Sequence, residues 1–275
     1  MTRDSGALFR DLHRKGDPVI LANAWDRGSA QMLVGLGARA IGTSSAAHAF
    51  TLGRPDMGHV SRDEAIAHAE DLVGAVSVPV SGDFENGFGD APETVAETVR
   101  LAAEAGLAGI SVEDTALPEN LAYDRTLAVE RIRAAASAAR SLSRDFVLVA
   151  RADGVMNGVY SIDEALARVV AFDAAGADCL YVPMPASVHD LGRVVGATQK
   201  PVNALAAGPF GKLRRADFAG LGIARISLGS ALARATHRVI RDAGKSMIED
   251  GDFSALGGIP GDEVDALLEA GRRPG

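Results

Sequence analysis

Eight short apolar runs recur along this chain, and they limit its fold more than any other feature. Each run is short and continuous, as strands buried on both faces of a parallel sheet tend to be. The runs are Val19–Ala22, Ala40–Thr43, Val78–Ser81, Gly109–Val112, Phe146–Val149, Cys179–Val182, Pro201–Ala204 and Arg225–Leu228. They predict eight strands of one parallel sheet.

Helical patterns fill the intervals between these runs. Ser61–Glu64 and Ser161–Glu164 resemble capping boxes, and Pro92 stands near the first position of another helix. Eight strands alternating with helices within 275 residues predict one closed (β/α)8 barrel that spans residues 1–275. An open doubly wound sheet is the structural alternative, but no G-x-G-x-x-G follows the first run. Residues 250–275 form a Gly-rich and then helical extension, with a helix expected over 262–270, which packs on the barrel or is exchanged with another subunit.

Composition excludes several classes of protein. The formal charge of −8 is spread along the chain without a basic block, which argues against nucleic acid as a partner. No apolar run reaches the roughly 18 residues of a membrane span, and the first six residues contain no apolar signal core. A single cysteine, Cys179, excludes an internal disulfide framework. A cytoplasmic protein is therefore expected.

Polar residues follow most of the predicted strands, at the end where barrel enzymes carry their active sites. These residues are Asn23, Trp25 and Asp26 after the first run; Thr43, Ser44 and Ser45 at the second, followed by a loop with His48, Asp56 and His59; Asp83, Glu85 and Asn86; Glu113 and Asp114; Arg151 and Asp153; and Gly229 and Ser230.

Acidic residues are concentrated after the third, fourth and fifth runs. Four or five carboxylates beside one arginine would repel one another, and they would be costly to desolvate without a cation. Magnesium prefers oxygen ligands, and the absence of histidine and cysteine from this group argues against zinc. The simpler alternatives are that Asp83 and Glu85 cap a helix, or that Arg151 forms a structural ion pair. Arg151 also suits an anionic substrate, because guanidinium binds carboxylates bidentately.

Other reactive side chains have simpler interpretations. The only lysines are Lys15, Lys200, Lys212 and Lys245, and none is at a strand end, which argues against a Schiff-base aldolase. Cys179 lies within a strand and is expected in the core. A surface or structural role is expected for His48 and His59.

At these residues the chain resembles the isocitrate lyase/phosphoenolpyruvate mutase superfamily, over roughly residues 17–240. The motifs that carry the resemblance are Leu52–Gly58, Gly82–Gly89, Gly109–Asp114 and Val149–Asp153, in this order at successive strand ends. The resemblance implies magnesium- or manganese-assisted chemistry on small 2-oxo or 2-hydroxy acids through a pyruvate enolate.

The resemblance also implies roles for individual residues. Asp83, Glu85 and Glu113 would bind the metal directly or through water, and Glu85 stands where aspartate is usual. Asp56 would contact the metal's waters or transfer a proton. Arg151 would hold the substrate carboxylate or stabilise the enolate, and Thr43, Ser44 and Ser45 would bind the substrate's carboxylate or oxo group.

The chain departs from the lyases that cleave isocitrate or methylisocitrate. Their Lys-Lys/Arg-Cys-Gly-His loop is replaced by residues 115–124, which contain neither cysteine nor histidine. Met184 replaces a glutamate of those lyases, and Leu205 stands where an asparagine is expected, with Asn203 two residues earlier. Isocitrate lyase activity is therefore not expected.

Three functions stay open. The leading hypothesis is a magnesium-dependent lyase-type enzyme that cleaves a C–C bond, by retro-aldol reaction, decarboxylation or hydrolysis, in a small 2-oxo or 2-hydroxy dicarboxylate. The first alternative is P–C chemistry, as in a phosphonopyruvate hydrolase or a mutase, although Arg125 is the only cation near the altered loop. The second is a barrel that binds a keto acid without turnover. The resemblance further implies a homo-oligomer, a tetramer or dimer.

Overall fold

The computed structural model describes residues 4–274 and contains the predicted closed barrel. Residues 1–3, part of the segment in which no signal core is expected, lie outside the described residues. The eight barrel strands are parallel, in the spatial order β1-β10-β9-β8-β7-β4-β3-β2. Their bounds are β1 Val19–Asn23, β2 Ile41–Gly42, β3 Val80–Asp83, β4 Gly109–Glu113, β7 Val147–Arg151, β8 Cys179–Tyr181, β9 Val202–Leu205 and β10 Arg225–Ser227. All eight predicted strands are confirmed.

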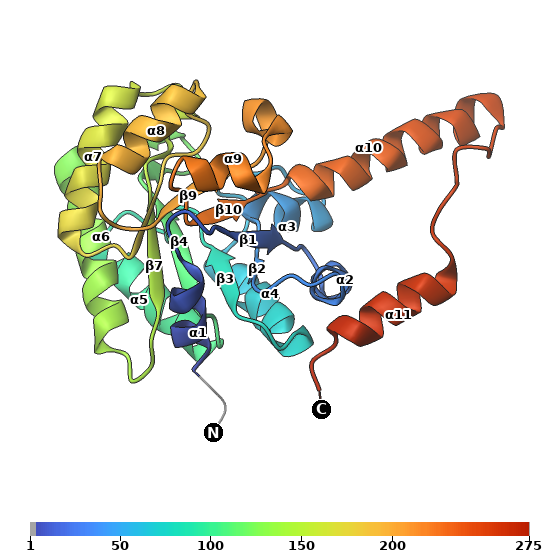
Figure 1. The fold of residues 1–275 in the computed structure, drawn as a ribbon, viewed down its shortest axis with the longest axis horizontal. Coiled ribbons are helices and arrows are strands. Elements are labelled where there is room, and N and C mark those ends of the chain that lie inside the picture. The colour runs from blue at the N-terminus through green and yellow to red at the C-terminus, as the bar shows by residue number, and fades with distance from the viewer. Residues whose placement is uncertain (1–3, 275) are drawn as a thin grey trace.

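Helices surround the barrel, as Figure 1 shows. The helices are α1 Ser5–Leu12, α2 Arg27–Gly35, α3 Ser45–Thr51, α4 Arg62–Ala75, α5 Pro92–Glu104, α6 Arg125–Ser141, α7 Ile162–Ala175, α8 Val188–Gly196, α9 Arg215–Gly220, α10 Ala231–Lys245 and α11 Gly261–Gly271. Three shorter helical turns are η1 Asp153–Val155, η2 Gly208–Lys212 and η3 Ser246–Asp250. Among the described residues, no helix is both long and apolar enough to cross a membrane.

The local signals in the sequence begin these helices as expected. Ser61 and Glu64 form a reciprocal capping box on α4, Pro92 is the first residue of α5, and the Ser161 side chain caps α7. The strand expected to begin at Val78 begins at Val80 instead, and β9 begins at Val202. Both strands therefore begin just after a proline, which has no N–H to donate to the sheet.

Two parts of the sequence prediction were wrong. The loop expected after β2 is helix α3, because Ser44 caps it and small residues follow. Strand β3 extends further than expected, so Asp83 is its last residue rather than a residue after it, whereas β4 and β7 end at Glu113 and Arg151 as expected. Helix α1 and the hairpin of β5 (Thr115–Ala116) and β6 (Leu121–Ala122) were not predicted.

The barrel interior is closed from below by α1. Phe9 of α1 is fully buried and packs with Val19, Val147 and Cys179 of the inner faces of the strands. The larger core lies between the strands and the surrounding helices. The open end of the barrel is therefore the end where the strands finish, as in other (β/α)8 barrels.

The C-terminal helices depart from the barrel. Helix α10 projects away from it, and the chain then returns so that α11 lies beside α2 (Figure 1). The contact between α2 and α11 is close: a Cβ on Gly271 would meet the Gln31 carbonyl oxygen at 1.8 Å, and one on Gly35 would meet that of Leu267 at 2.4 Å. The expected C-terminal helix thus packs on its own barrel here, whereas α10 has little cover.

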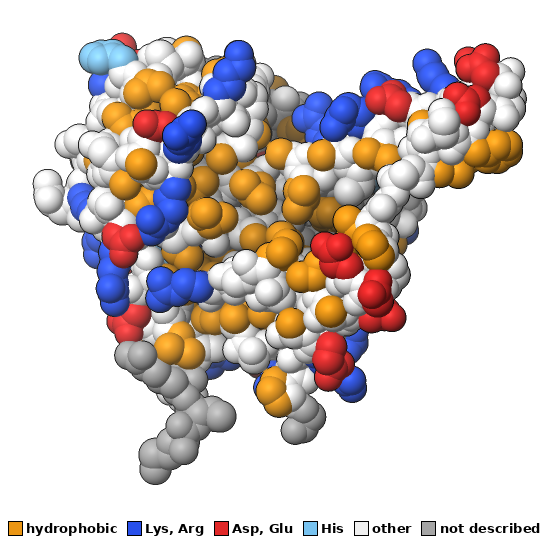
Figure 2. Space-filling view, turned by 45° about the vertical axis from the view of Figure 1, so that its right-hand side comes forward, with side chains coloured by type: hydrophobic (Ala, Val, Ile, Leu, Met, Phe, Trp, Pro, Cys, Tyr) orange, Lys and Arg blue, Asp and Glu red, His pale blue; other side chains and the backbone are white. Residues whose placement is uncertain are grey.

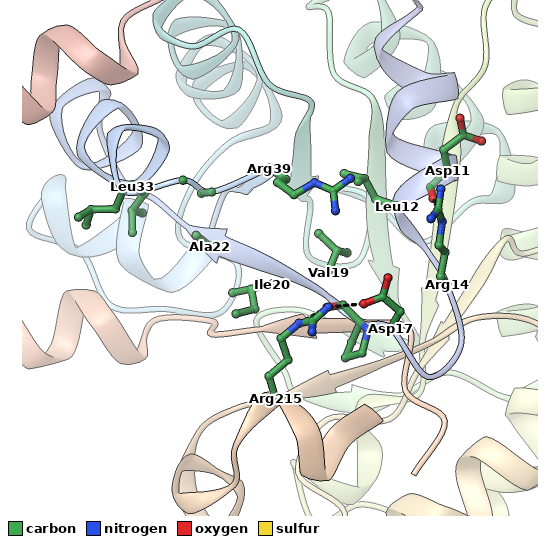
Figure 3. Close-up of a pocket in the computed structure, with 14 residues that line it drawn as sticks. Asp11, Leu12, Arg14, Asp17, Val19, Ile20, Ala22, Leu33, Arg39 and Arg215 are labelled. Carbon is green, nitrogen blue, oxygen red and sulfur yellow. Dashed lines mark hydrogen bonds and ion pairs between the residues drawn. The ribbon is translucent and has the colours of Figure 1, made fainter. Parts of the chain in front are cut away.

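The departure of α10 leaves part of β1 uncovered. A cavity of about 420 Å³ lies over this strand and includes Val19, Ile20 and Leu33 in its lining, and Arg215 pairs with Asp17 at its edge (Figure 3). Ile20 is 46% exposed, although it lies in a barrel strand. Hydrophobic side chains gather on the face beside the projecting helix, as Figure 2 shows.

Candidate active site

Arg151 forms the centre of the site. Its Nη1 donates to Asp83 Oδ1 at 2.6 Å, and its Nε and Nη2 donate to Asp153 at 3.0 and 2.5 Å. A further ion pair joins Nη2 to Glu113 Oε2 at 3.1 Å. These residues meet because β3, β4 and β7 are neighbours and Glu113 stands opposite Arg151 in the register. The predicted convergence of acidic strand ends on one arginine is present in the structure.

Asp83 is held by residues that directly follow the neighbouring strand β2. Its Oδ2 accepts hydrogen bonds from the backbone N–H and the hydroxyl of Ser45, each at 3.0 Å, and its own N–H donates to Thr43 Oγ1 at 2.8 Å. Ser44 instead caps α3 by accepting from Ala47 N–H. Thr43 and Ser45 therefore hold Asp83, Ser44 lines the same cavity, and the role of all three toward a substrate stays a prediction.

Asp56 and Glu85 complete the acidic group. Glu85 adopts a positive φ of 44°, and its Oε1 accepts a hydrogen bond from Gly58 N–H at 3.1 Å. Asp56 Oδ1 accepts from Met57 N–H at 2.8 Å. Both side chains line one small cavity with Glu113 and Arg151.

The protonation of this group reflects burial among like charges. Burial, and then the Asp83 and Asp56 carboxylates, raise the pKa of Glu85 to about 7. Burial and the Asp153 carboxylate raise the pKa of Glu113 well above its ordinary value, and burial with Asp83 raises that of Asp56. Although burial opposes it, the surrounding carboxylates raise the pKa of Arg151. The site contains more carboxyl groups than Arg151 alone can hold in the charged form.

This donor set fits a hard divalent cation. Five carboxylates (Asp56, Asp83, Glu85, Glu113 and Asp153) surround one guanidinium. Within residues 4–274, no three His, Cys, Asp or Glu side chains are arranged to hold a metal ion together. Magnesium needs only one or two direct carboxylates and keeps waters or substrate oxygens for the rest. The chemistry of the donor set therefore agrees with water-mediated magnesium, and not with a zinc site.

A buried network that the sequence did not predict supports this centre. Asp114 accepts hydrogen bonds from Asp153 N–H at 2.8 Å, from the Tyr160 hydroxyl at 2.8 Å and from Arg168 Nη1 at 2.9 Å. The side chains of Asp114 and Arg168 are 2% and 6% exposed. Asp114 thus fixes the backbone of Asp153, which holds Arg151. The one sequence signal was the position of Asp114 directly after Glu113.

The site opens into a small cavity inside the end of the barrel. It encloses about 150 Å³ and extends from Ser45, Asp56 and Ser230 at the rim to Tyr181 and Arg225 below. None of the four lysines lines it. Arg125, from the altered loop region, pairs with Glu164 and is 50% exposed, so it is committed elsewhere.

The remaining reactive residues have structural surroundings. Cys179 is buried in β8, as predicted, and burial raises the pKa of its thiol to about 12. His48 of α3 stacks on His68 of α4, with ring centroids 3.8 Å apart. Burial and the neighbouring His68 lower the pKa of His48 to about 4. His59 does not line the central cavity.

The barrel and its carboxylate-rich end define a (β/α)8-barrel enzyme, and comparison with known proteins gives its family. The model of the phosphoenolpyruvate phosphomutase family matches residues 9–248. The chain therefore belongs to the isocitrate lyase/phosphoenolpyruvate mutase superfamily, whose members related to it are lyases and phosphonomutase-type enzymes.

Individual relatives cover most of the chain. It is 32% identical over 199 residues to the 2,3-dimethylmalate lyase of Eubacterium barkeri, covering 70% of this chain and 67% of that protein. It is 29% identical over 272 residues to the oxaloacetate decarboxylase of Paraburkholderia xenovorans (strain LB400), covering 95% and 87%. A crystal structure from Burkholderia cenocepacia J2315 is 42% identical, with a TM-score of 0.90, and covers 95% of this chain and 94% of that one.

Proposed function

We propose that this protein is a magnesium-dependent enzyme that cleaves a C–C bond in a small 2-oxo or 2-hydroxy dicarboxylate through an enolate. The observation that carries the proposal is the ring of carboxylates around Arg151 at the mouth of a cavity of about 150 Å³. The similarity to a dimethylmalate lyase and an oxaloacetate decarboxylase supports this class of substrate.

Asp83, Glu85 and Glu113 would hold Mg²⁺ or Mn²⁺, directly or through water. When bound, this ion would stabilise negative charge on an enolate oxygen as a Lewis acid. Arg151 is fixed by three carboxylates and therefore presents its guanidinium in one orientation, where it stabilises developing negative charge without reorganising. The part of the pocket that takes the substrate's carboxylate or oxo group would be lined by Thr43, Ser44 and Ser45.

Asp56 is the residue that we assign to proton transfer. It lies in the cavity beside the proposed metal-binding carboxylates, and burial together with the Asp83 carboxylate raises its pKa. Since Oδ1 accepts a hydrogen bond from Met57 N–H, we assign Oδ2 as the oxygen that takes up the proton and later returns it. A carboxyl whose pKa is raised toward the working pH can both receive a proton from a substrate hydroxyl and return it to the enolate carbon.

P–C chemistry is the alternative substrate class. A phosphonate carries more negative charge than a carboxylate and would need additional cations near the site. The only cation in the altered loop region, Arg125, pairs with Glu164 and does not line the cavity. The altered loop therefore supplies no cation for a phosphonate at the rim of the cavity, which favours a carboxylate at that position. Intact Asp83, Glu113 and Arg151, together in one site, favour turnover over keto-acid binding alone.

The decisive experiment is a screen for substrate loss with magnesium present, with pyruvate and oxalate measured as products. The substrates are oxaloacetate, substituted malates, methylisocitrate and phosphonopyruvate, each with wild-type protein and with Asp83→Ala. We expect magnesium-dependent turnover of a small dicarboxylate that Asp83→Ala abolishes. Turnover of phosphonopyruvate alone would establish the P–C alternative. Efficient methylisocitrate cleavage would refute the inference from the missing loop cysteine.

Assembly and location are part of the proposal. An oligomer, a dimer or tetramer, would cover the exposed side chains of α10 and the open flank of β1 by exchange of C-terminal helices. Helix α11 packs closely on α2 of its own chain, whereas α10 exposes Val239 and Ile240. We therefore assign α10, rather than the segment after residue 250, as the exchanged helix. A cytoplasmic location agrees with the single buried cysteine.

A further inference from the structure

The lower part of the central cavity contains polar atoms that have no partner. Among the described residues, Nε and Nη1 of Arg225, Oγ of Ser81 and Oδ1 of Asn203 are buried without a hydrogen bond. Arg225 is only 5% exposed, Ser81 1% and Asn203 0%. Buried polar groups in proteins are nearly always hydrogen-bonded, so several orphaned groups in one place indicate a missing ligand.

The strands bring these atoms together below the metal-binding carboxylates. Arg225 and Asn203 stand opposite each other on β10 and β9. Ser81 precedes Asp83 by two residues on β3, and Arg225 precedes Ser227 by two on β10. Two residues of strand span about 7 Å, so this group lies one side-chain layer deeper than the rim. Ser81 and Arg225 line the same cavity as Asp83 and Arg151.

Within residues 4–274, Arg225 forms no ion pair, and its Nε and Nη1 have no hydrogen-bond partner. Its guanidinium lies 5.8 Å from the centre of the Phe9 ring, a weak contact compared with an ion pair. The Asp83 carboxylate, which acts on Arg225 less than the Cys179 and Tyr181 side chains do, is already bound by Arg151 and Ser45. An unpaired buried cation is unfavourable, and burial lowers the pKa of Arg225 accordingly.

We propose that Arg225, with Ser81, forms an anion-binding subsite that takes one carboxylate below the metal site. The guanidinium offers two free donors and the Ser81 hydroxyl a third. Rotation of the Asn203 amide, whose Nδ2 now donates to Ser227 Oγ at 2.9 Å, would present a fourth. Below this layer, the unpartnered His13 Nε2 is an acceptor, because Nδ1 bonds to the Phe9 carbonyl oxygen at 2.8 Å. An acceptor nitrogen cannot donate a hydrogen bond to an anion, so His13 is not part of the subsite.

The carboxylate has two sources, the second carboxylate of a substrate bound at the rim or a free small anion. The subsite itself rests on the unpaired guanidinium and does not depend on the proposed reaction. Only the first source rests on the proposed function. In that case Arg225 selects dicarboxylates whose length spans the distance from the rim to the lower layer.

The test measures anion binding by calorimetry without metal, using oxalate, malonate, succinate and acetate. The proteins are wild type, Arg225→Met, Arg225→Lys and Arg125→Met, which removes an equal charge far from the cavity. Loss of a charge-assisted contact predicts at least a tenfold weaker affinity in Arg225→Met, partial recovery in Arg225→Lys and no change in Arg125→Met. Weakening only for the longer dicarboxylates identifies the substrate's second carboxylate, whereas equal weakening for acetate identifies a free anion.

Thermal unfolding gives a second measurement. Without anions, Arg225→Met is expected to melt at the wild-type temperature or above, because it removes an uncompensated charge. Malonate should stabilise wild type and not Arg225→Met. Unchanged affinities, or an Arg225→Met protein that is unstable or unfolded without anions, would overturn the subsite. A crystal structure of wild type with malonate that shows only water beside Arg225 would also overturn it. All these outcomes are independent of magnesium and of turnover.

Discussion

The carboxyl end of the barrel and the flank beside α10 are built in opposite ways. At the carboxyl end, charged side chains of β3, β4 and β7 are joined by ion pairs within the chain, and Arg151 is 11% exposed. On the flank, apolar side chains lack cover: Val239 and Ile240 of α10 are 56% and 68% exposed, and Ile20 of β1 is 46% exposed.

This difference suggests that the carboxyl end of the barrel serves catalysis and the flank beside α10 serves contact with a second copy. The ion pairs that hold Arg151 lie within one chain. The flank leaves apolar surface in water, where each Å² buried by a partner would contribute roughly 25 cal/mol. A helix of a second copy would suit it, because α10 leaves the place beside β1 that a barrel helix normally covers (Figures 1 and 3).

The largest effect is expected from Asp83→Ala. This change removes a proposed metal-binding carboxylate and the partner of Arg151 Nη1, and we expect kcat/KM to fall by about a hundred- to a thousandfold. Calorimetric titration with Mg²⁺ and steady-state kinetics would measure both losses. Asp71→Ala, at an exposed pair with Arg27, is the control. Unchanged magnesium binding in Asp83→Ala would show that the metal site is wrongly placed.

The next largest effect is on stability, and it should differ between two arginines that contact the same glutamate. Arg168 and Arg125 both pair with Glu164, but Arg168 is 6% exposed and also neutralises buried Asp114. Arg168→Met should lower the free energy of unfolding by about 3–5 kcal/mol, because it leaves a buried carboxylate unpaired. Arg125→Met should cost less than about 1 kcal/mol. Urea unfolding measures both losses, and equal losses would show that the buried Arg168–Asp114 pair does not stabilise the fold more than the exposed Arg125–Glu164 pair does.

The strand-end residues, the network around Asp114 and the flank beside α10 differ in how much of each could be predicted from the sequence. Asp83, Glu113 and Arg151 were predicted together, because strand ends in a barrel share one edge and the residues are close to strand signals. Tyr160 and Arg168 were not predicted, because their partner Asp114 is distant in the sequence and Arg168 lies in an ordinary helical pattern. The path of α10 depends on packing beyond one strand or helix, which local patterns do not encode.

A smaller effect is expected from pH. Glu85 has a pKa of about 7 in the folded protein, above its unfolded value of 4.5, so folding favours the protonated form. Its contribution to stability is full below about pH 4.5 and is lost as the pH rises through about 7. Magnesium favours the charged form, so its affinity should rise from about pH 6 to 8.

Thermal unfolding with and without Mg²⁺ would test this dependence. Without metal, the midpoint should fall as the pH rises from 5 to 8 on the order of a few degrees, and added Mg²⁺ should restore more stability at pH 8 than at pH 6. Glu85→Gln, which does not titrate, should flatten the metal-free curve. Parallel curves for the two proteins would assign the dependence to Glu113 or Asp56 instead.

The smallest effect on catalysis is expected from Ile240→Glu. A charge on the exposed face of α10 would disfavour its burial against a second copy, so light scattering should detect a smaller species than wild type. The site lies within one chain, so kcat should stay within about twofold of wild type. Val170→Glu, at an exposed valine of α7, is the matched control and should leave the size unchanged. An Ile240→Glu protein of wild-type size would exclude α10 as the interface, whereas a large loss of kcat would show that the flank and the site are coupled after all.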